Sequence, residues 1–122
     1  MSEREAVNGM EENEDKKRGG RDLHVEVRTP HGHYPPQVRE DVSSKLVELT
    51  RFFKGTHSIR AILDHHQNRH RIELLASTGG RTTLAVDATS TNFAKALHES
   101  VHRMQRALRK HKVRITKVRR RH

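Results

Sequence analysis

The feature that most constrains the fold of this chain is a run of three alternating apolar segments with very short connections. The segments span residues 58–65, 69–77 and 81–88, and the turn-forming pairs Gln67-Asn68 and Gly79-Gly80 separate them. Alternation of apolar and polar residues is typical of a strand with one buried face, and connections this short join antiparallel neighbours. We therefore expect a three-stranded antiparallel meander.

The two faces of this meander can be assigned from the alternation. The inward face would hold Ile59, Ala61 and Leu63, then Ile72, Leu74 and Ala76, then Leu84 and Val86. The opposite face would hold Arg60, Arg71, Glu73 and Thr83. Because this second face is polar, we expect it to stay in contact with solvent.

Two segments with helical periodicity flank the meander. Residues 37–53 carry an apolar stripe at spacings of three and four, and Pro36 suits the first turn of such a helix. The second helix follows Ser90 or Thr91, either of which can cap it, and ends near Lys110. The stripes comprise Val38, Val42, Leu46, Leu49 and Phe53, and Phe93, Leu97, Val101, Met104 and Leu108.

A further alternating segment at 22–28 predicts a first strand, which makes the element order β-α-β-β-β-α. Two helices with one apolar stripe each and a sheet with one apolar face bury these surfaces by packing as two layers. We expect an α+β domain over residues 22–111, with two helices on one face of a four-stranded sheet. Residues 1–21 would form a disordered tail, acidic and then basic, and residues 112–122 a basic C-terminal tail.

The charge of the chain predicts a polyanionic partner. The net charge is +10, from 25 Lys and Arg against 15 Asp and Glu, and residues 1–15 are acidic, so the remainder is more basic still. There is no Cys, which excludes disulfides and thiolate metal sites and fits a reducing compartment. No apolar run approaches the ~20 residues that span a bilayer, so we expect a cytoplasmic protein without membrane contact.

The cations of the second helix lie opposite its apolar stripe, and only Glu99 interrupts them. A helix face that is merely solvated usually mixes charge signs, so we interpret this face as a polyanion-binding surface. The first helix gives a weaker signal, because acids accompany its cations. The candidate contacts are Arg39, Lys45 and Arg51 on the first helix, and Lys95, Arg103, Arg106, Arg109, Lys110 and Lys112 on or after the second.

The aromatic residues do not provide a surface on which bases could stack. Phe52, Phe53 and Phe93 lie on or beside the apolar stripes, where the core needs them. We therefore expect recognition of phosphate and of shape.

Several short motifs, taken in order, resemble one family. They are Pro36-Gln37-Val38-Arg39, Leu46…Leu49…Phe52-Phe53, Asn68-Arg69-His70, Gly79-Gly80, Phe93-Ala94-Lys95-Ala96-Leu97 and Leu108-Arg109-Lys110-His111-Lys112. Their order and spacing over about residues 23–112 resemble the ribosome hibernation promoting factors, a family that includes ribosome-associated inhibitor A.

The resemblance implies a fold similar to a double-stranded-RNA-binding domain. It also implies binding to small-subunit rRNA in the tRNA–mRNA channel near the decoding centre, which keeps ribosomes idle under stress or in stationary phase. Family positions for rRNA contact match Lys45, Arg51, Arg103, Arg106, Arg109 and Lys110.

The chain departs from the family pattern in several places. Pro35 replaces a Thr that could cap the first helix, and Thr91 and His98 replace acids around the second. The sequence also resembles the short form, without the second domain with which long members pair ribosomes. The resemblance therefore implies ribosome dimerisation only with the help of another factor.

Two other functions remain open. A general double-stranded-RNA-binding module or a ribosomal protein would share the basic face. A metal-dependent nuclease could use His65, His66 and His70, because imidazoles ligate zinc. No catalytic motif appears at usable spacing, so we expect no enzyme activity, metal, cofactor or small-molecule substrate.

Overall fold

The computed structural model describes residues 23–31, 34–51, 53–79 and 82–121, with side chains as far as Lys112. The elements are β1 (His24–Arg28), α2 (Pro36–Thr50), β2 (Thr56–His66), β3 (Arg69–Thr78), β4 (Thr82–Ser90) and α3 (Phe93–Arg121). The expected order β-α-β-β-β-α is confirmed. The expected tail at 1–21 lies outside the described residues.

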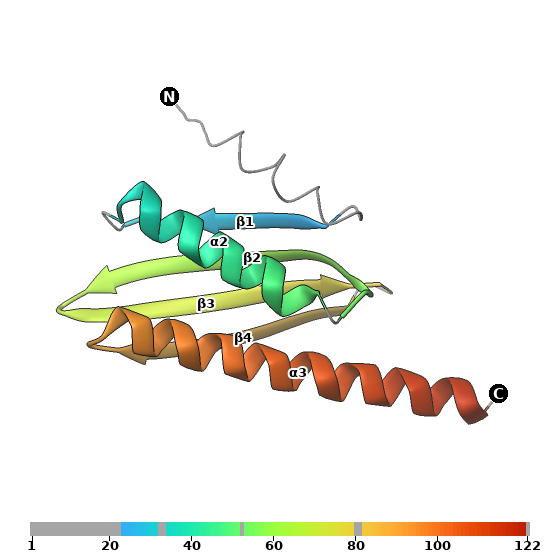
Figure 1. Ribbon diagram of the computed structural model, residues 1–122. Coiled ribbons are helices and arrows are strands. Elements are labelled where there is room, and N and C mark those ends of the chain that lie inside the picture. Colours follow the sequence, from blue (N-terminus) through green and yellow to red (C-terminus); the bar gives the residue numbers. More distant parts are fainter. Residues whose placement is uncertain (1–22, 32–33, 52, 80–81, 122) are drawn as a thin grey trace.

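The four strands form one sheet in the order β1-β2-β3-β4. β1 and β2 are parallel, because α2 carries the chain back between them, whereas β2, β3 and β4 are antiparallel neighbours joined by short turns. Figure 1 shows both helices on the same face of the sheet, with α2 over β1 and β2 and α3 along β4. The two-layer α+β architecture is therefore confirmed.

The core lies between the helices and this face of the sheet. The inward residues expected on β2 and β3 are all buried, and Leu84 and Val86 of β4 are half-buried because β4 is an edge strand. The helices contribute Val42, Leu46, Leu49, Ala96, Met104 and Leu108 to the buried cluster. On the opposite face of the sheet, which we call the open face, no helix lies among the described residues, in agreement with the polar residues of that face.

The β2–β3 connection is a two-residue turn. His66 and Arg69 are register partners, and Gln67 and Asn68 between them have positive φ angles of 50° and 64°. Two consecutive left-handed residues are the signature of a type I′ turn, whose twist matches that of the flanking strands. The expected turn at Gln67-Asn68 is thus confirmed.

The start of α3 differs from the sequence prediction by one or two residues. The Asn92 side-chain oxygen accepts a hydrogen bond from the Lys95 N–H at 3.0 Å, so Asn92 caps the helix. Ser90 is the last residue of β4, and its hydroxyl accepts from the Asn92 N–H at 3.1 Å. The expected cap at Ser90 or Thr91 is therefore wrong, because the strand continues further than the alternation of apolar residues indicated.

The helix ends also differ. α2 ends at Thr50, whose hydroxyl donates to the Leu46 and Val47 carbonyls of the last turn, three residues before the expected end at position 53. α3 runs to Arg121, so the expected end near Lys110 is wrong. No Gly or Pro follows Phe93, and cations in the last turns of a helix complement its negative end. The helix thus includes residues that we had assigned to a basic tail.

Candidate nucleic-acid interface

The buried side of α3 determines where its charges point. Ala96, Ser100, Met104 and Leu108 are buried and follow one another at intervals of four. Ser100 satisfies its hydroxyl within the helix by donating to the Leu97 carbonyl at 2.9 Å. Side chains on the opposite side of such a helix must therefore project into solvent.

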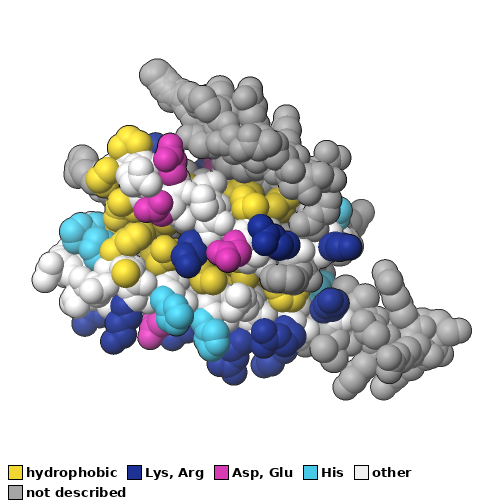
Figure 2. Space-filling view, in the orientation of Figure 1, with side chains coloured by type: hydrophobic (Ala, Val, Ile, Leu, Met, Phe, Trp, Pro, Cys, Tyr) yellow, Lys and Arg dark blue, Asp and Glu magenta, His cyan; other side chains and the backbone are white. Residues whose placement is uncertain are grey.

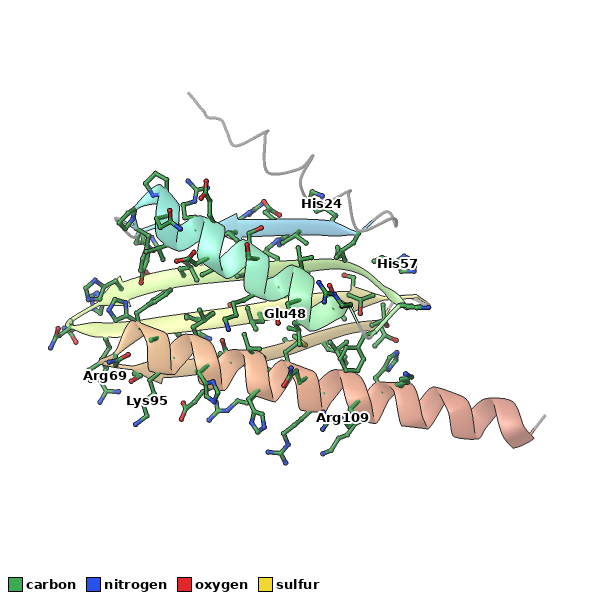
Figure 3. All side chains as sticks on the ribbon, viewed as in Figure 1. His24, Glu48, His57, Arg69, Lys95 and Arg109 are labelled. Atoms are coloured by element: carbon green, nitrogen blue, oxygen red, sulfur yellow. The ribbon has the colours of Figure 1, made fainter. Side chains whose placement is uncertain are left out.

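Five cations project from α3, and we call them the α3 cationic face. They are Lys95, Arg103, Arg106, Arg109 and Lys110, and all are exposed. Figure 2 shows Lys and Arg side chains gathered along the α3 edge of the molecule, with histidines among them. Figure 3 shows Lys95 and Arg109 pointing away from the sheet on the same side of the helix.

Within the part of the chain that the structure describes, none of these five cations forms an ion pair with a carboxylate. Arg103 donates to the backbone carbonyl of Asp87, which ties α3 to β4 without neutralising the guanidinium charge. Glu99, which interrupts the face in the sequence, is half-buried. The structure thus brings five candidate cations together on one surface.

Lys112 lies apart from this face. It is exposed one helical turn after the buried Leu108, so it stands at the flank of the apolar stripe. His98 and His102, by contrast, share the α3 cationic face, although neither was among our candidate contacts. The helical spacing already places His102 opposite the apolar stripe, and His98 precedes it by four residues.

The three candidate cations associated with α2 do not form one surface. They follow one another at intervals of six residues, which rotates each by about 240° from the last. Arg39 is half-buried, and its Nε has no hydrogen-bond partner among the described atoms. Lys45 and Arg51 are exposed, but Asp41 and Glu48 accompany them on the helix. The sequence provides only weak support for a binding surface on this helix, and the structure shows why: its cations point in different directions and acids lie among them.

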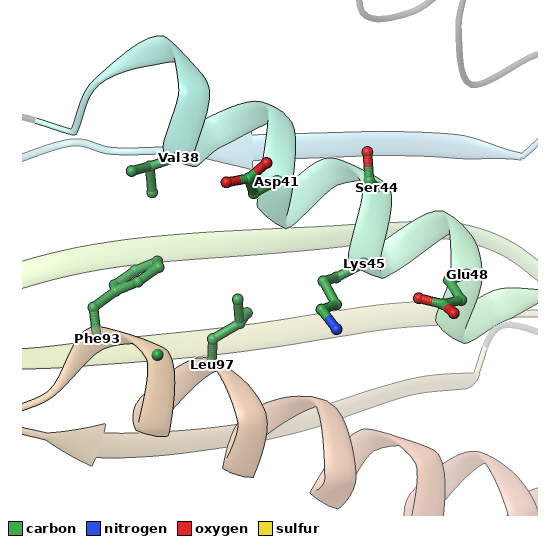
Figure 4. Close-up of a pocket in the computed structure, with 8 residues that line it drawn as sticks. Val38, Asp41, Ser44, Lys45, Glu48, Phe93 and Leu97 are labelled. Atoms are coloured by element: carbon green, nitrogen blue, oxygen red, sulfur yellow. The ribbon is translucent and has the colours of Figure 1, made fainter.

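A groove of about 490 Å³ separates α2 from α3. Its walls are apolar at Val38, Phe93, Ala94 and Leu97, and charged groups of both signs line the α2 side. Figure 4 shows Lys45 extending from α2 toward α3, Asp41 and Glu48 beside α2, and Phe93 and Leu97 pointing from α3 toward α2. Because its charges are mixed, this groove is a poorer place for a phosphate than the α3 cationic face.

The open face of the sheet also carries arginines, and carboxylates pair with three of them. Glu26 accepts from Arg28 Nε at 2.7 Å and from Arg60 Nε at 3.1 Å. Arg71 Nη2 lies 3.0 Å from Asp87 Oδ2. Partial burial alone would raise the pKa of Glu26, but the hydrogen bonds and charges of the two arginines outweigh burial and lower it. These three arginines are therefore paired within the open face.

The histidines near the β2–β3 turn pack against aromatic residues. The rings of His65 and His70 stack with centroids 4.0 Å apart, and Tyr34 Oη lies 2.9 Å from His70 Nδ1. Phe93 meets the His70 ring edge-on at 5.5 Å. Partial burial, together with the neighbouring His65, lowers the pKa of His70, so this ring favours the neutral form.

This packing bears on the nuclease hypothesis. His65 and His66 are consecutive strand residues and so point to opposite faces of the sheet. Among the described residues, no group of three His, Asp or Glu side chains is placed to hold a metal ion. The stacking of the His65 and His70 rings gives these two histidines a structural role that does not involve a metal ion.

Comparisons with known proteins identify the fold and the family. Within the described ranges, no helix is long and apolar enough to cross a membrane. No curated protein sequence matches the chain. A ribosomal subunit interface protein from Coxiella burnetii has a similar structure, with a TM-score of 0.67 and 19% identity over 74% of this chain and 98% of that one.

The N-terminal domain of Protein Y from Thermus thermophilus is similar as well, with a TM-score of 0.61 and 15% identity over 74% of this chain and 98% of that one. At such identities the likeness establishes the fold alone. The model of one family, Sigma 54 modulation protein / S30EA ribosomal protein, matches residues 25–116, which is most of the chain. The chain therefore belongs to this sigma-54 modulation and ribosome hibernation family.

Proposed function

We propose that this protein binds small-subunit rRNA in the tRNA–mRNA channel near the decoding centre and keeps ribosomes idle under stress or in stationary phase. The observation that carries the proposal is the α3 cationic face, whose five cations are exposed and unpaired with any described carboxylate. Cations left unneutralised by their own chain are available to phosphate, and the counterions released from the RNA favour binding.

The geometry of α3 suits a folded RNA. From Lys95 to Lys110 the helix rises about 22 Å, and packing against β3 and β4 holds it rigid. A rigid row of cations loses little conformational freedom on binding and selects phosphates that are already fixed in space. Ribosomal RNA provides such phosphates, whereas a flexible single strand does not.

The remaining surface favours recognition of phosphate and shape over reading of bases. Phe53 and Phe93 are half-buried and pack against the core, so they are not available as stacking platforms. We therefore propose a factor that acts by occupying its site, without catalysis. The family and the printed name of the Coxiella burnetii protein support a ribosomal setting.

The competing function is a general double-stranded-RNA-binding module, which the same cationic face would serve. Co-sedimentation of the full chain with purified small subunits, large subunits and an RNA duplex separates the two functions. We expect the protein to co-sediment with small subunits. An RNA duplex added at an equal concentration of phosphate should not displace the protein from them. The rRNA should be recovered intact, and addition of the protein should inhibit translation.

Equal binding to small subunits, large subunits and duplex would contradict the proposed site and favour the general module. Cleavage of the recovered rRNA that a chelator prevents would instead support the nuclease hypothesis. Binding to small subunits without inhibition of translation would place the protein on the subunit outside the tRNA–mRNA channel.

A further inference from the structure

Two histidines lie among the cations of α3. His98 and His102 are separated by one helical turn, both are exposed, and their rings are nearly parallel, at 4°, with centroids 6.4 Å apart. Lys95 precedes His98 by three residues, and Arg106 follows His102 by four, so all four side chains share one side of the helix. No hydrogen bond or ion pair joins either ring to another described residue.

The charged groups around these rings are mainly cations on α3 itself, and are of both signs on the elements packed against it. On α3 itself they are Lys95, Glu99, Arg103, Arg106 and Arg109. α2 contributes Asp41, Lys45 and Glu48, which line the groove on one flank of α3. β3 and β4 contribute Arg71, Glu73 and Asp87, and Arg71 pairs with both acids on the open face of the sheet. The only acid within α3 near the two rings is Glu99, as far as the described residues go.

We propose that His98 and His102 contact RNA phosphates in their protonated form, so that the α3 cationic face gains up to two charges as the pH falls. This inference rests on the proposed function and adds two binding residues to it. A phosphate beside an imidazole favours the protonated ring. Binding therefore takes up protons, and by linkage the affinity rises as the pH falls.

The expected size of the effect follows from the same linkage. A neighbouring opposite charge shifts the protonation equilibrium of such a group by about one unit or more, and one unit corresponds to about tenfold in affinity. An unperturbed imidazole is largely neutral at about pH 8 and largely protonated at about pH 5.5. Between these values we expect the full chain to bind small subunits at least about tenfold more tightly at the lower pH.

The test measures the dissociation constant for small subunits at both pH values and constant salt, for the wild type and H98Q/H102Q. The matched control is H24Q/H57Q, which removes two exposed histidines that Figure 3 shows on the β1–β2 side of the molecule. The wild type and the control should show the full gain at low pH, and H98Q/H102Q should lose most of it. At the higher pH, the difference in affinity between H98Q/H102Q and the wild type should be smaller than at the lower pH.

A second variant, H98K/H102K, places fixed charges at the same positions. It should bind at the higher pH about as tightly as the wild type does at the lower one. Circular dichroism at both pH values establishes that each variant is folded. An undiminished gain in H98Q/H102Q would overturn the inference while leaving the proposed function intact, whereas failure of the wild type to bind at either pH would overturn the proposed function.

Discussion

The α3 cationic face and the open face of the sheet are both rich in arginine, yet they differ in what the arginines contact. On the sheet, Arg28, Arg60 and Arg71 each lie within about 3 Å of a carboxylate. No described carboxylate pairs with the five cations of the α3 cationic face. Net charge alone would count both sets of arginines equally. The placement of the acids separates cations that stabilise the fold from cations that are free to bind a partner.

Strand register and helical spacing produce this difference. Glu26 and Arg60 are register partners of adjacent strands, and so are Glu73 and Asp87, which both reach Arg71. Opposite charges on neighbouring strands stabilise the pairing of the strands. Glu99 is the only acid among residues 93–112 of α3, so i,i+4 pairing within this part of the helix is scarcely available.

The largest effect should come from reversing charge on α3. We expect R106E/R109E/K110E to weaken small-subunit binding by more than about a hundredfold, because each charge-assisted contact contributes on the order of 1–3 kcal/mol. All three side chains are exposed, so urea unfolding should show a stability close to that of the wild type. A folded variant that still co-sediments would exclude the α3 cationic face as the binding surface.

The corresponding change on the sheet should affect stability instead. In R28Q/R60Q/R71Q three arginines lose their charge, which lowers the net charge by three units, against six units in the α3 variant. The free energy of unfolding should fall by about 1 kcal/mol in total, because exposed ion pairs contribute little individually. Binding to small subunits should stay within about threefold of the wild type. A large loss of binding would mean that RNA also contacts the open face.

His70, on the helix side of the sheet, should contribute less stability in acid, in contrast to the gain in binding proposed for the histidines of α3. Because the pKa of His70 is lowered in the folded protein, the unfolded chain takes up more protons. The stability that His70 contributes is therefore present above the ordinary imidazole pKa of about 6.5 and is lost as the pH falls below it. Urea unfolding should show a smaller loss between neutral and acidic pH in H70F, which keeps an aromatic ring beside Tyr34 and Phe93. An equal loss in both proteins would assign the pH dependence to other groups.

The smallest effect should come from the β2–β3 turn, which sets the register of these two strands. Gln67 has a φ angle of 50°, which Asn and Gly adopt more readily. We expect Q67N/N68G to raise the free energy of unfolding by about 0.5–1 kcal/mol and to leave RNA binding unchanged. Lower stability in this variant would contradict the type I′ assignment.

Much of the fold was predictable from the sequence because it follows from local periodicity. The inward residues of β2 and β3, the order of elements and the grouping of cations on α3 each depend on spacings within one segment. The parallel pairing of β1 with β2 and the contacts of Arg28 and Arg60 with Glu26 depend on register between distant segments. No single segment contains that information.

The same distinction explains what was missed at the candidate site. His70 packs on Tyr34, which lies 36 positions away in the sequence. The sequence does not reveal this contact, and it shows only that several histidines occur close together. The partial burial of Arg39 depends on how α2 lies against the sheet. The continuation of α3 to Arg121 was, in contrast, readable from the lack of Gly and Pro. We nevertheless predicted a tail after residue 111, because we gave more weight to the high density of positive charge than to the absence of helix-breaking residues.

The measurement that tests the central claim most directly is the salt dependence of small-subunit binding in R106A/R109A/K110A and in the wild type. Each phosphate contact contributes a slope of about −0.7 to −0.9 to the logarithm of affinity against the logarithm of salt concentration. If these three cations bind phosphate, the variant should bind more weakly, with a slope shallower by about 2 units. Parallel lines of equal slope would contradict the account, because they would mean that the α3 cationic face releases no counterions.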